Sequence, residues 1–262
     1  MNAKSQHRKL IAALAVRNQG SRLYGKPLQN LDVKNGITIL DNIIDCLKSI
    51  SCIDEIVLGI SEGVENKIFI NFAHQNNLKY IIGDEIDVLS RLISCGDAAE
   101  ATDIFRVTSE SPFPSFELVD NAWSQHVEGD FDATFLDDVV DGCGFEIIKL
   151  KNLVTSHLDG EDRHRSELCT LYIRENIDTF NVKRIESPTQ FIRKDLRLTV
   201  DNPEDLIVCK EAYHHLKHYA PRIPLEKIID YLDDRPELIA LTMPFTEQGY
   251  ASMYRWTKNE EK

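Results

Sequence analysis

The sequence predicts an α/β fold in which a mostly parallel, mixed sheet is flanked by helices. In the first 110 residues, short apolar runs typical of buried strands alternate with segments whose apolar residues recur at helical spacing. Strands and helices that alternate in this way form βαβ units with a parallel sheet. After residue 130 the apolar runs are shorter and surround a polar stretch, which predicts an insertion or lid on the same sheet.

The first half of the chain has the clearer pattern. Thr38–Ile50 is predicted as an amphipathic helix because isoleucine and leucine recur on one face, and Thr38 or Asp41 is suited to cap its start. Further helices are expected over Lys67–Asn76 and Val88–Ala99. The expected strands are Leu10–Val16, Glu55–Ile60, Lys79–Ile82 and Ile104–Thr108.

The second half is predicted to complete the same domain. No internal repeat or linker interrupts residues 1–262, so we expect a single domain, with residues 140–180 as an insertion and residues 205–262 as C-terminal helices. The helices are expected over Pro203–Tyr219, Leu225–Leu232 and Ala240–Lys262. Short β-like segments cover Ala133–Leu136, Phe145–Leu150, Asn181–Ile185 and Leu196–Val200 around the polar stretch His157–Ser166.

The composition excludes several classes of protein. The 262 residues carry 30 Lys and Arg against 43 Asp and Glu, a net charge of −13 that disfavours nucleic acid and anionic membranes as partners. No apolar stretch is long enough for a transmembrane helix, and the run Leu10–Val16 is too short for a secretory signal. The six scattered cysteines include no C-x-x-C pair, which favours a reduced, cytoplasmic protein.

The basic residues that follow the first strand form a candidate phosphate site. Residues 1–26 contain no acid, and Arg17, Arg22 and Lys26 follow the strand within ten residues. Arginine and lysine at a strand-to-loop turn can surround a polyphosphate, and Gly20 and Gly25 let the backbone approach it. The spacing matches neither the Walker loop nor the dinucleotide fingerprint. A solvated basic loop is the alternative interpretation.

Two acidic residues form a candidate metal site. Glu110 follows the fourth predicted strand and Asp201 follows the segment Leu196–Val200. Carboxylates at two strand ends can hold a Mg²⁺ that bridges protein and phosphates. Asp201, ahead of Pro203-Glu204-Asp205, is equally suited to cap a helix.

The role of two further groups of polar residues cannot be decided from their spacing alone. His157, Arg163, His164 and Arg165 can either contact an acidic acceptor or belong to a solvated lid. The three histidines at 214, 215 and 218 suggest a metal site by their spacing, but without partner ligands they fit a surface helix better.

At several points the chain resembles the cytidylyltransferase superfamily that activates acidic sugars, including the acylneuraminate and 3-deoxy-manno-octulosonate enzymes. The likeness is greatest to its spore-coat polysaccharide branch. The motifs that carry it are the Val16–Leu28 segment, Gly83–Arg91 with its Asp-Val-Leu-x-Arg, Asp103–Thr108, Glu167 with Thr170 and Tyr172, Arg197–Asp205 and Asp234–Leu238.

The resemblance implies a function as well as a fold. It implies a Rossmann-like sheet of the nucleotide-diphospho-sugar transferase type, a homodimer formed partly by residues 140–180, and transfer of CMP from CTP to a small acidic sugar with release of pyrophosphate. Arg17, Arg22 and Lys26 would act on the CTP phosphates, and Glu110 and Asp201 would hold Mg²⁺. The implied nucleotide-binding residues are Arg17, Gly20, Ser21, Arg22, Lys26, Asp87 and Arg106.

The chain departs from the family pattern at four points. The Gly-Asp-x-Pro metal turn is here Ser109-Glu110-Ser111-Pro112, which lengthens the carboxylate by one methylene. Tyr24, Gly144 and Leu168 stand where the family has proline, aspartate and histidine. Glutamate can still bind Mg²⁺, whereas the acceptor pocket is expected to differ.

Three other functions stay open at this stage. The acceptor can be phosphorylated or a phosphonate, which would give a CDP-type product. The chain can be a nucleotide-binding homologue that has lost turnover. It can also be a glycosyltransferase that acts on a ready-made nucleotide sugar and uses Asp137-Asp138 or a neighbouring acid as its metal site.

Overall fold

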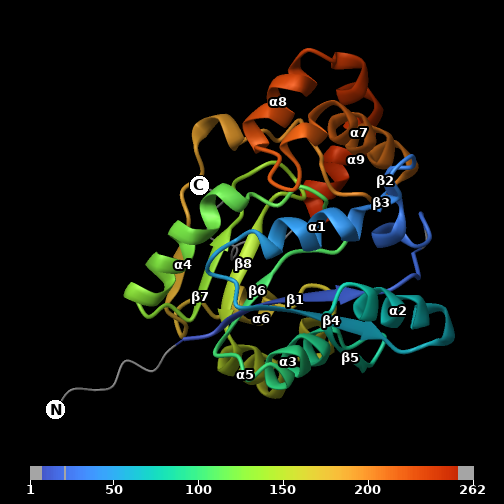
Figure 1. Cartoon of the computed structure of the whole chain (residues 1–262). Helices are drawn as coiled ribbons and strands as arrows, with labels where there is room; N and C mark the ends of the chain where they lie inside the picture. The colour runs from blue at the N-terminus through green and yellow to red at the C-terminus, as the bar shows by residue number, and fades with distance from the viewer. Residues whose placement is uncertain (1–7, 21, 253–262) are drawn as a thin grey trace.

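A computed structural model describes residues 8–20 and 22–252, which form a main sheet with helices on both faces and a small antiparallel sheet of β2 (Asn30–Asp32) and β3 (Ile37–Thr38) (Figure 1). The main sheet has seven strands in the order β5-β4-β1-β6-β8-β7-β9. Strand β8 is antiparallel to both of its neighbours, while the other pairings are parallel. The strand bounds are β1 Leu10–Val16, β4 Glu55–Ser61, β5 Lys79–Gly83, β6 Asp103–Arg106, β7 Ala133–Leu136, β8 Phe145–Lys149 and β9 Val182–Arg184.

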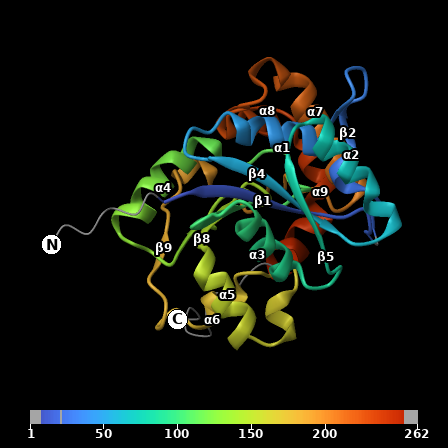
Figure 2. The same cartoon turned by 60° about the horizontal axis from the view of Figure 1, so that its bottom comes forward.

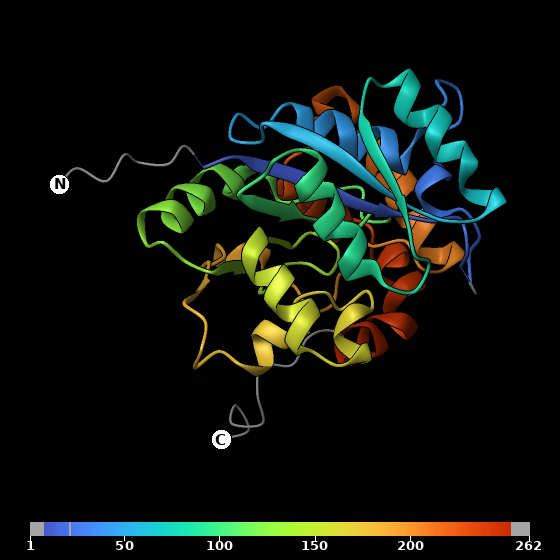
Figure 3. The same cartoon turned by 90° about the horizontal axis from the view of Figure 1, so that it is seen from below.

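The helices form a layer on each face of the sheet. Side chains of α1 (Ile39–Lys48), α2 (Lys67–Gln75), α4 (Val119–Glu128), α7 (Pro203–Leu216) and α8 (Leu225–Asp233) belong to one apolar core. Side chains of α3 (Val88–Ala98), α5 (Leu150–Asp159) and α6 (Leu171–Glu175) belong to a second core. This second layer comes forward in Figure 2. In Figure 3, seen from below, α3 and α5 lie next to each other on the same face of the sheet. The last helix, α9 (Pro236–Ser252), contacts α7 and α8.

Strand β1 is central because its residues are apolar on both faces. Leu10, Leu14 and Val16 point into one core and Ile11 and Ala13 into the other. A strand buried on both sides is expected to be a continuous apolar run, as this one is. Its carboxyl end, together with that of β6, opens at the edge of the sheet where ligands bind in such folds.

Most of the predicted elements are confirmed, with ends that differ by one to three residues. Helix α1 begins after Thr38, whose hydroxyl accepts a hydrogen bond from the Asp41 backbone while the Asp41 carboxylate accepts one from the Thr38 backbone. Residues 140–180 include β8, which lies between β6 and β7 within the main sheet. Part of the predicted tail helix Ala240–Lys262 lies outside the described residues, and the helix begins earlier, at Pro236.

The prediction of a strand over Leu196–Val200 is wrong. Only Arg197 makes a single bridge, to Asp141, and the segment joins no ladder of the sheet. Its alternating pattern has another cause, since Leu196, Leu198 and Val200 enter the apolar core while Arg197 and Thr199 line a cavity. Helix α4 was not predicted, because its apolar residues are few and interrupted by polar ones.

All six cysteines are free thiols, and burial raises the pKa of Cys95 to about 12. Among the described helices, none combines the length and the apolar character needed to cross a bilayer.

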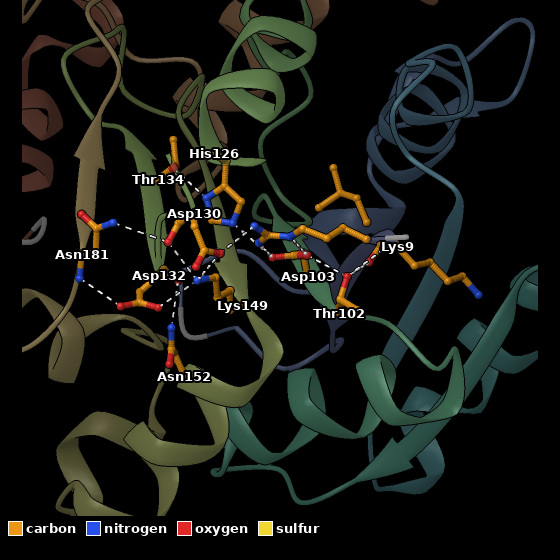
Figure 4. A network of polar contacts seen from close by, with 12 residues as sticks. Lys9, Thr102, Asp103, His126, Asp130, Asp132, Thr134, Lys149, Asn152 and Asn181 are labelled. Carbon is orange, nitrogen blue, oxygen red and sulfur yellow. Dashed lines mark hydrogen bonds and ion pairs between the residues drawn. The ribbon is translucent and has the colours of Figure 1, made fainter. Parts of the chain in front are cut away.

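A buried polar network ties the amino ends of the strands together (Figure 4). His126 of α4 is fully buried, with Nδ1 2.7 Å from the Thr134 hydroxyl and Nε2 3.1 Å from an Asp103 carboxylate oxygen. Asp103 also accepts hydrogen bonds from the Arg8 guanidinium and from the Thr102 hydroxyl. Burial alone would raise the pKa of Asp103, but these hydrogen bonds outweigh it and leave the pKa below its usual value.

We expect this network to make the protein sensitive to mild acid. Burial lowers the pKa of His126 more than Asp103 raises it, so the unfolded chain takes up a proton at this histidine at a higher pH than the folded chain does. The free energy of unfolding should therefore fall as the pH drops below about 6.5, the unfolded value. Urea unfolding between pH 7.5 and 5 should show a smaller fall for His126→Gln than for the wild type. Equal slopes would contradict this role.

Candidate active site

A two-lobed cleft lies at the carboxyl ends of β1 and β6. The smaller lobe, of about 350 Å³, lies beside the loop after β1 and the start of α3, and we call it the β1 lobe. The larger lobe, of about 780 Å³, extends over β8, the end of β7 and one residue of α9, Phe245, and we call it the β8 lobe. The residues common to both are Arg22, Arg106, Val107, Thr108, Glu110, Glu167 and Asp201.

The loop after β1 supplies most of the cations of the β1 lobe. Arg17, Arg22 and Lys26 all line it, as does Gly20. Gly25 starts the 3-10 turn Lys26–Leu28 with a positive φ of 61°, and its backbone N–H donates to the Asn18 carbonyl at 2.8 Å. A Cβ at Gly20 would lie 2.3 Å from the Leu23 carbonyl oxygen, so this tight loop requires glycine there. Ser21 lies outside the described residues.

Each of these three cations faces an acidic side chain. Lys26 Nζ lies 2.5 Å and Arg22 Nη2 3.2 Å from Oδ1 of Asp201, and Arg17 lies 3.7 Å from Glu167. The side chains of Arg17 and Arg22 remain 43% and 50% exposed, so their ion pairs are weak and readily exchanged for those of a bound anion. The predicted cationic site is therefore present as a group of side chains around one lobe.

Asp201 is held in place by a buried arginine. Arg197, whose side chain is 4% exposed, binds Asp201 as well as Asp141 at 2.5 Å and Asp205 at 3.1 Å. Burial alone would raise the pKa of Asp201, but Lys26, Arg197 and Arg22 outweigh it and the pKa is lowered. Asp201 is thus an ionised carboxylate at the junction of the two lobes.

Backbone pairing brings Glu110 to the same junction. The Val200 N–H donates to the Glu110 carbonyl at 3.0 Å, and Ser109 Oγ donates to the Ala15 carbonyl at 2.9 Å. Burial raises the pKa of Glu110, Lys26 opposes this, and Asp201 adds to it by repulsion. No ion pair neutralises Glu110 in the part of the chain that the structure describes, so a cation here would relieve both burial and repulsion.

The two carboxylates Glu110 and Asp201 fit Mg²⁺, which takes its remaining ligands from substrate and water, better than a metal whose ligands all come from the protein. Within residues 8–20 and 22–252 there is no group of three or more His, Cys, Asp or Glu side chains arranged to hold a metal. Mg²⁺ is commonly held by one or two carboxylates, with phosphate and water oxygens as its other ligands. Glu110 and Asp201 line the cleft as such a pair.

The β8 lobe contains a second ion-pair network. Glu146 of β8 binds Arg106 of β6 at 2.6 Å, Arg174 of α6 at 2.8 Å and the Thr170 hydroxyl at 2.6 Å. Arg174 also forms a forked pair with Asp137 at 2.8 and 3.0 Å. The antiparallel register sets Arg106 opposite Glu146, so the reversed strand places this carboxylate at the cleft edge.

Other predicted residues lie away from the cleft. Asp87 lines neither lobe; its carboxylate accepts a hydrogen bond from the Ser90 backbone at the start of α3 and lies 2.7 Å from His157 Nε2. Arg163 and His164 pair with Glu175. His215 stacks on Tyr231, and the ring of His218 is tilted against that of Tyr219. All three histidines at 214, 215 and 218 are exposed, which agrees with a surface helix.

Arg174 and Phe245 line the cleft but were not predicted as site residues, and Arg91 was noted only as the last residue of the motif Gly83–Arg91. Arg91 and Arg174 are among the largest fully buried side chains, and both sit on helices where an arginine usually faces solvent. The position of Arg91 between the apolar residues Leu89 and Leu92 was a further signal. Phe245 reaches the cleft from a distant part of the chain, so no local pattern predicts it.

Two proteins of known sequence are similar to this chain over most of its length, although no family model matches it. The chain is 24% identical over 242 residues to an uncharacterised protein of Methanocaldococcus jannaschii, a match that covers 92% of this chain and 98% of that protein. It is 25% identical over 185 residues to the spore coat polysaccharide biosynthesis protein SpsF of Bacillus subtilis, which covers 70% and 77%.

Solved structures share the fold. A cytidylyltransferase from Leptospira borgpetersenii superposes with a TM-score of 0.80 and 19% identity over 89% of this chain and 97% of that one. A CMP:2-keto-3-deoxy-manno-octonic acid synthetase complexed with CTP superposes with a TM-score of 0.59 and 13% identity over 79% and 99%. The predicted fold class and the resemblance to the spore-coat branch are confirmed.

We expect Arg197 to be essential for the stability of this edge of the sheet. Arg197→Met leaves three buried or half-buried carboxylates without their shared cation, which should lower the free energy of unfolding by about 3–5 kcal/mol. Arg193→Met, which removes a more exposed arginine between Asp195 and Asp233, should cost about 1 kcal/mol or less. Urea unfolding of both variants measures the difference, and equal losses would contradict the assignment.

Proposed function

We propose that this protein is a Mg²⁺-dependent cytidylyltransferase that transfers CMP from CTP to an acidic sugar and releases pyrophosphate, for surface polysaccharide biosynthesis. One observation carries the proposal: Arg22, Glu110 and Asp201 meet where the two lobes join, with Arg17 and Lys26 beside them. A cleft with two compartments and a charged junction suits a reaction between a nucleotide and a second substrate. The neighbours' fold and the likeness to SpsF support the same class.

The β1 lobe is the proposed CTP site. Its loop cations and the close backbone approach at Gly20 suit a triphosphate. Phosphate oxygens would replace Glu167 and Asp201 as partners of Arg17 and Arg22, because these two ion pairs are exposed, contribute little and exchange easily. Lys26, whose pair with Asp201 is more buried, would bind phosphate from beside that carboxylate. A structure of similar fold is described as a complex with CTP, which favours this nucleotide.

The β8 lobe is the proposed acceptor site. It combines apolar walls from Leu136, Val139 and Phe145 with charged groups, a lining suited to the mixed surface of a sugar. The arginines deep in this lobe are already paired with carboxylates, whereas Arg22 is half exposed and lines both lobes. Arg22, which is assigned to the phosphates, also borders this lobe, so the carboxylate of a sugar acid would lie beside it at the junction.

The reaction follows from positioning and charge. An acceptor hydroxyl from the β8 lobe attacks the α-phosphorus and gives up its proton to solvent, a new P–O bond forms, and the bond from the α-phosphorus to the bridging β-phosphate oxygen breaks. Lys26, Arg17 and Arg22 stabilise the negative charge that accumulates on the leaving pyrophosphate. Glu110 and Asp201 would hold Mg²⁺, which supplies further charge neutralisation on the phosphates when bound. Asp87 would act indirectly, by fixing the start of α3.

Two alternative functions are less well supported. A glycosyltransferase that uses Asp137 as a metal ligand is disfavoured, because both Asp137 oxygens are bound to Arg174. A phosphorylated or phosphonate acceptor, giving a CDP-type product, needs the same junction and differs only in the acceptor. The homodimer and the cytoplasmic location that the sequence suggested stay predictions.

We expect pyrophosphate release from CTP in the presence of an acidic sugar. A screen of four NTPs against sugar acids and phosphorylated or phosphonate acceptors should give turnover with CTP. Lys26→Ala should lower the rate by roughly 10²–10³-fold, since it removes a charge that stabilises the leaving group. Lys34→Ala, an exposed lysine outside the cleft, is the matched control and should keep the wild-type rate. Turnover by Lys26→Ala at the control rate would refute the proposed phosphate site.

We also expect Glu110 to set the Mg²⁺ requirement. Glu110→Gln keeps the side-chain volume and removes one of two anionic ligands, so the Mg²⁺ concentration for half-maximal rate should rise about tenfold or more. Glu85→Gln changes an exposed glutamate outside the cleft and should leave the requirement as in the wild type. If Glu110→Gln and the wild type titrate alike with Mg²⁺, Glu110 is not a ligand.

A further inference from the structure

Arg91 is a buried cation that the proposed reaction does not use. It is 2% exposed, lies on α3 and lines the β1 lobe. Its Nη1 donates to the Gly59 carbonyl at 3.0 Å and to the Val16 carbonyl at 3.4 Å. Its Nε has no hydrogen-bond partner. A buried N–H without a partner costs on the order of 1–3 kcal/mol, so this group requires an explanation.

The surrounding strands leave space for this side chain. A Cβ at Gly83, the last residue of β5, would lie 2.8 Å from Arg91 Cγ. A Cβ at Gly59 of β4 would lie 3.5 Å from Arg91 Cβ and 3.2 Å from Cys95 Sγ. Glycine at position 83 therefore leaves room for the Arg91 side chain, while the tight contact at Gly59 is with Cys95. The guanidinium itself lies against the backbone carbonyls of β1 and β4.

The guanidinium forms no ion pair with a carboxylate of the described residues. Its pKa is lowered, first by burial and further by the nearby charge of Arg17, and the charge of Asp84 opposes this only in part. A buried charge without an ion pair is unfavourable unless a ligand supplies acceptor atoms. The ligand that enters the β1 lobe is therefore the natural partner of this group.

The character of the lobe around Arg91 separates it from the phosphate site. Ala13 and Ala15 of β1 and Val88 and Leu92 of α3 line the lobe together with Arg91, and these four residues are small or aliphatic. Arg17 and Arg22, by contrast, are half exposed on the loop. A flat heterocycle fits between small alanines and aliphatic side chains, whereas a triphosphate needs the exposed cations.

We propose that Arg91 reads the nucleobase, by donating to two adjacent acceptors on the edge of a cytosine, O2 and N3. This inference rests on the proposed function and names the residue that selects its nucleotide. A forked guanidinium matches two neighbouring acceptors in one plane. Uracil carries a hydrogen on N3 and would direct a donor at the guanidinium. A site built for two acceptors therefore rejects uracil.

The experiment measures nucleotide binding by calorimetry, so it does not depend on turnover. Wild type, Arg91→Lys and Arg91→Met are titrated with CTP, UTP and tripolyphosphate. Arg235→Met, a remote and exposed arginine, is the matched control. The wild type and the control should bind CTP about tenfold or more tighter than UTP, and both Arg91 variants should lose this ratio. Their affinity for tripolyphosphate should stay within about twofold of the wild type.

A second measurement uses the unaltered protein in case the variants do not fold. The wild type is titrated with 3-deazacytidine triphosphate, which lacks the N3 acceptor and should bind roughly tenfold more weakly than CTP. Equal binding of this analogue and CTP, or an equal loss of tripolyphosphate binding in folded Arg91 variants, overturns the proposal. This outcome can be separated from the proposed function. Selective CTP binding without pyrophosphate release would refute only the transferase activity. Turnover in which the Arg91 variants keep the wild-type preference for CTP over UTP would refute only the role of Arg91.

Discussion

The shared burial of Arg197 among three carboxylates is the interaction on which the candidate site depends. Arg197 binds Asp141 from the loop before β8 and both Asp201 and Asp205 from the start of α7. It therefore joins the sheet to the C-terminal helices and fixes the Asp201 carboxylate at the junction of the two lobes. The capping box at Asn202, in which Asp205 takes part, holds the helix start in the same place. Without this cation, a metal ligand and a helix terminus would lose their common support.

A second constraint is the reversed strand β8. Because β8 runs antiparallel between β6 and β7, its first residues lie at the edge where the parallel strands end. Glu146 consequently reaches the cleft and pairs with Arg106 and Arg174. This arrangement uses the arginines of the β8 lobe for structure and leaves the half-exposed Arg22 available for an incoming anion. The same pairing restricts which acceptors this lobe can admit.

Much of the fold and part of the site could be predicted from the sequence. The apolar run of β1, the periodicity of α1 and the capping pair Thr38 and Asp41 are patterns among neighbouring residues. Such local patterns predict secondary structure without knowledge of the tertiary fold. The cations Arg17, Arg22 and Lys26 were found because they cluster within ten residues. Leu196–Val200 misled the prediction, because alternation between a core and a cavity looks the same in sequence as alternation across a sheet.

The sequence by itself determined the class of fold, the basic loop and the two carboxylates, because each is a property of neighbouring residues. Only the tertiary structure decided which groups remain available to a ligand. In the sequence, Arg174 and Arg197 carry the same charge as Arg22. In the fold, Arg174 and Arg197 are buried in ion pairs with carboxylates, whereas the side chain of Arg22 is half exposed. Arg91 shows the converse, since long-range packing buries it beside Gly59 and Gly83, where it forms no ion pair with a carboxylate of the described residues. The sequence shows which residues are charged, but which of them form ion pairs depends on distances that exist only in the folded chain.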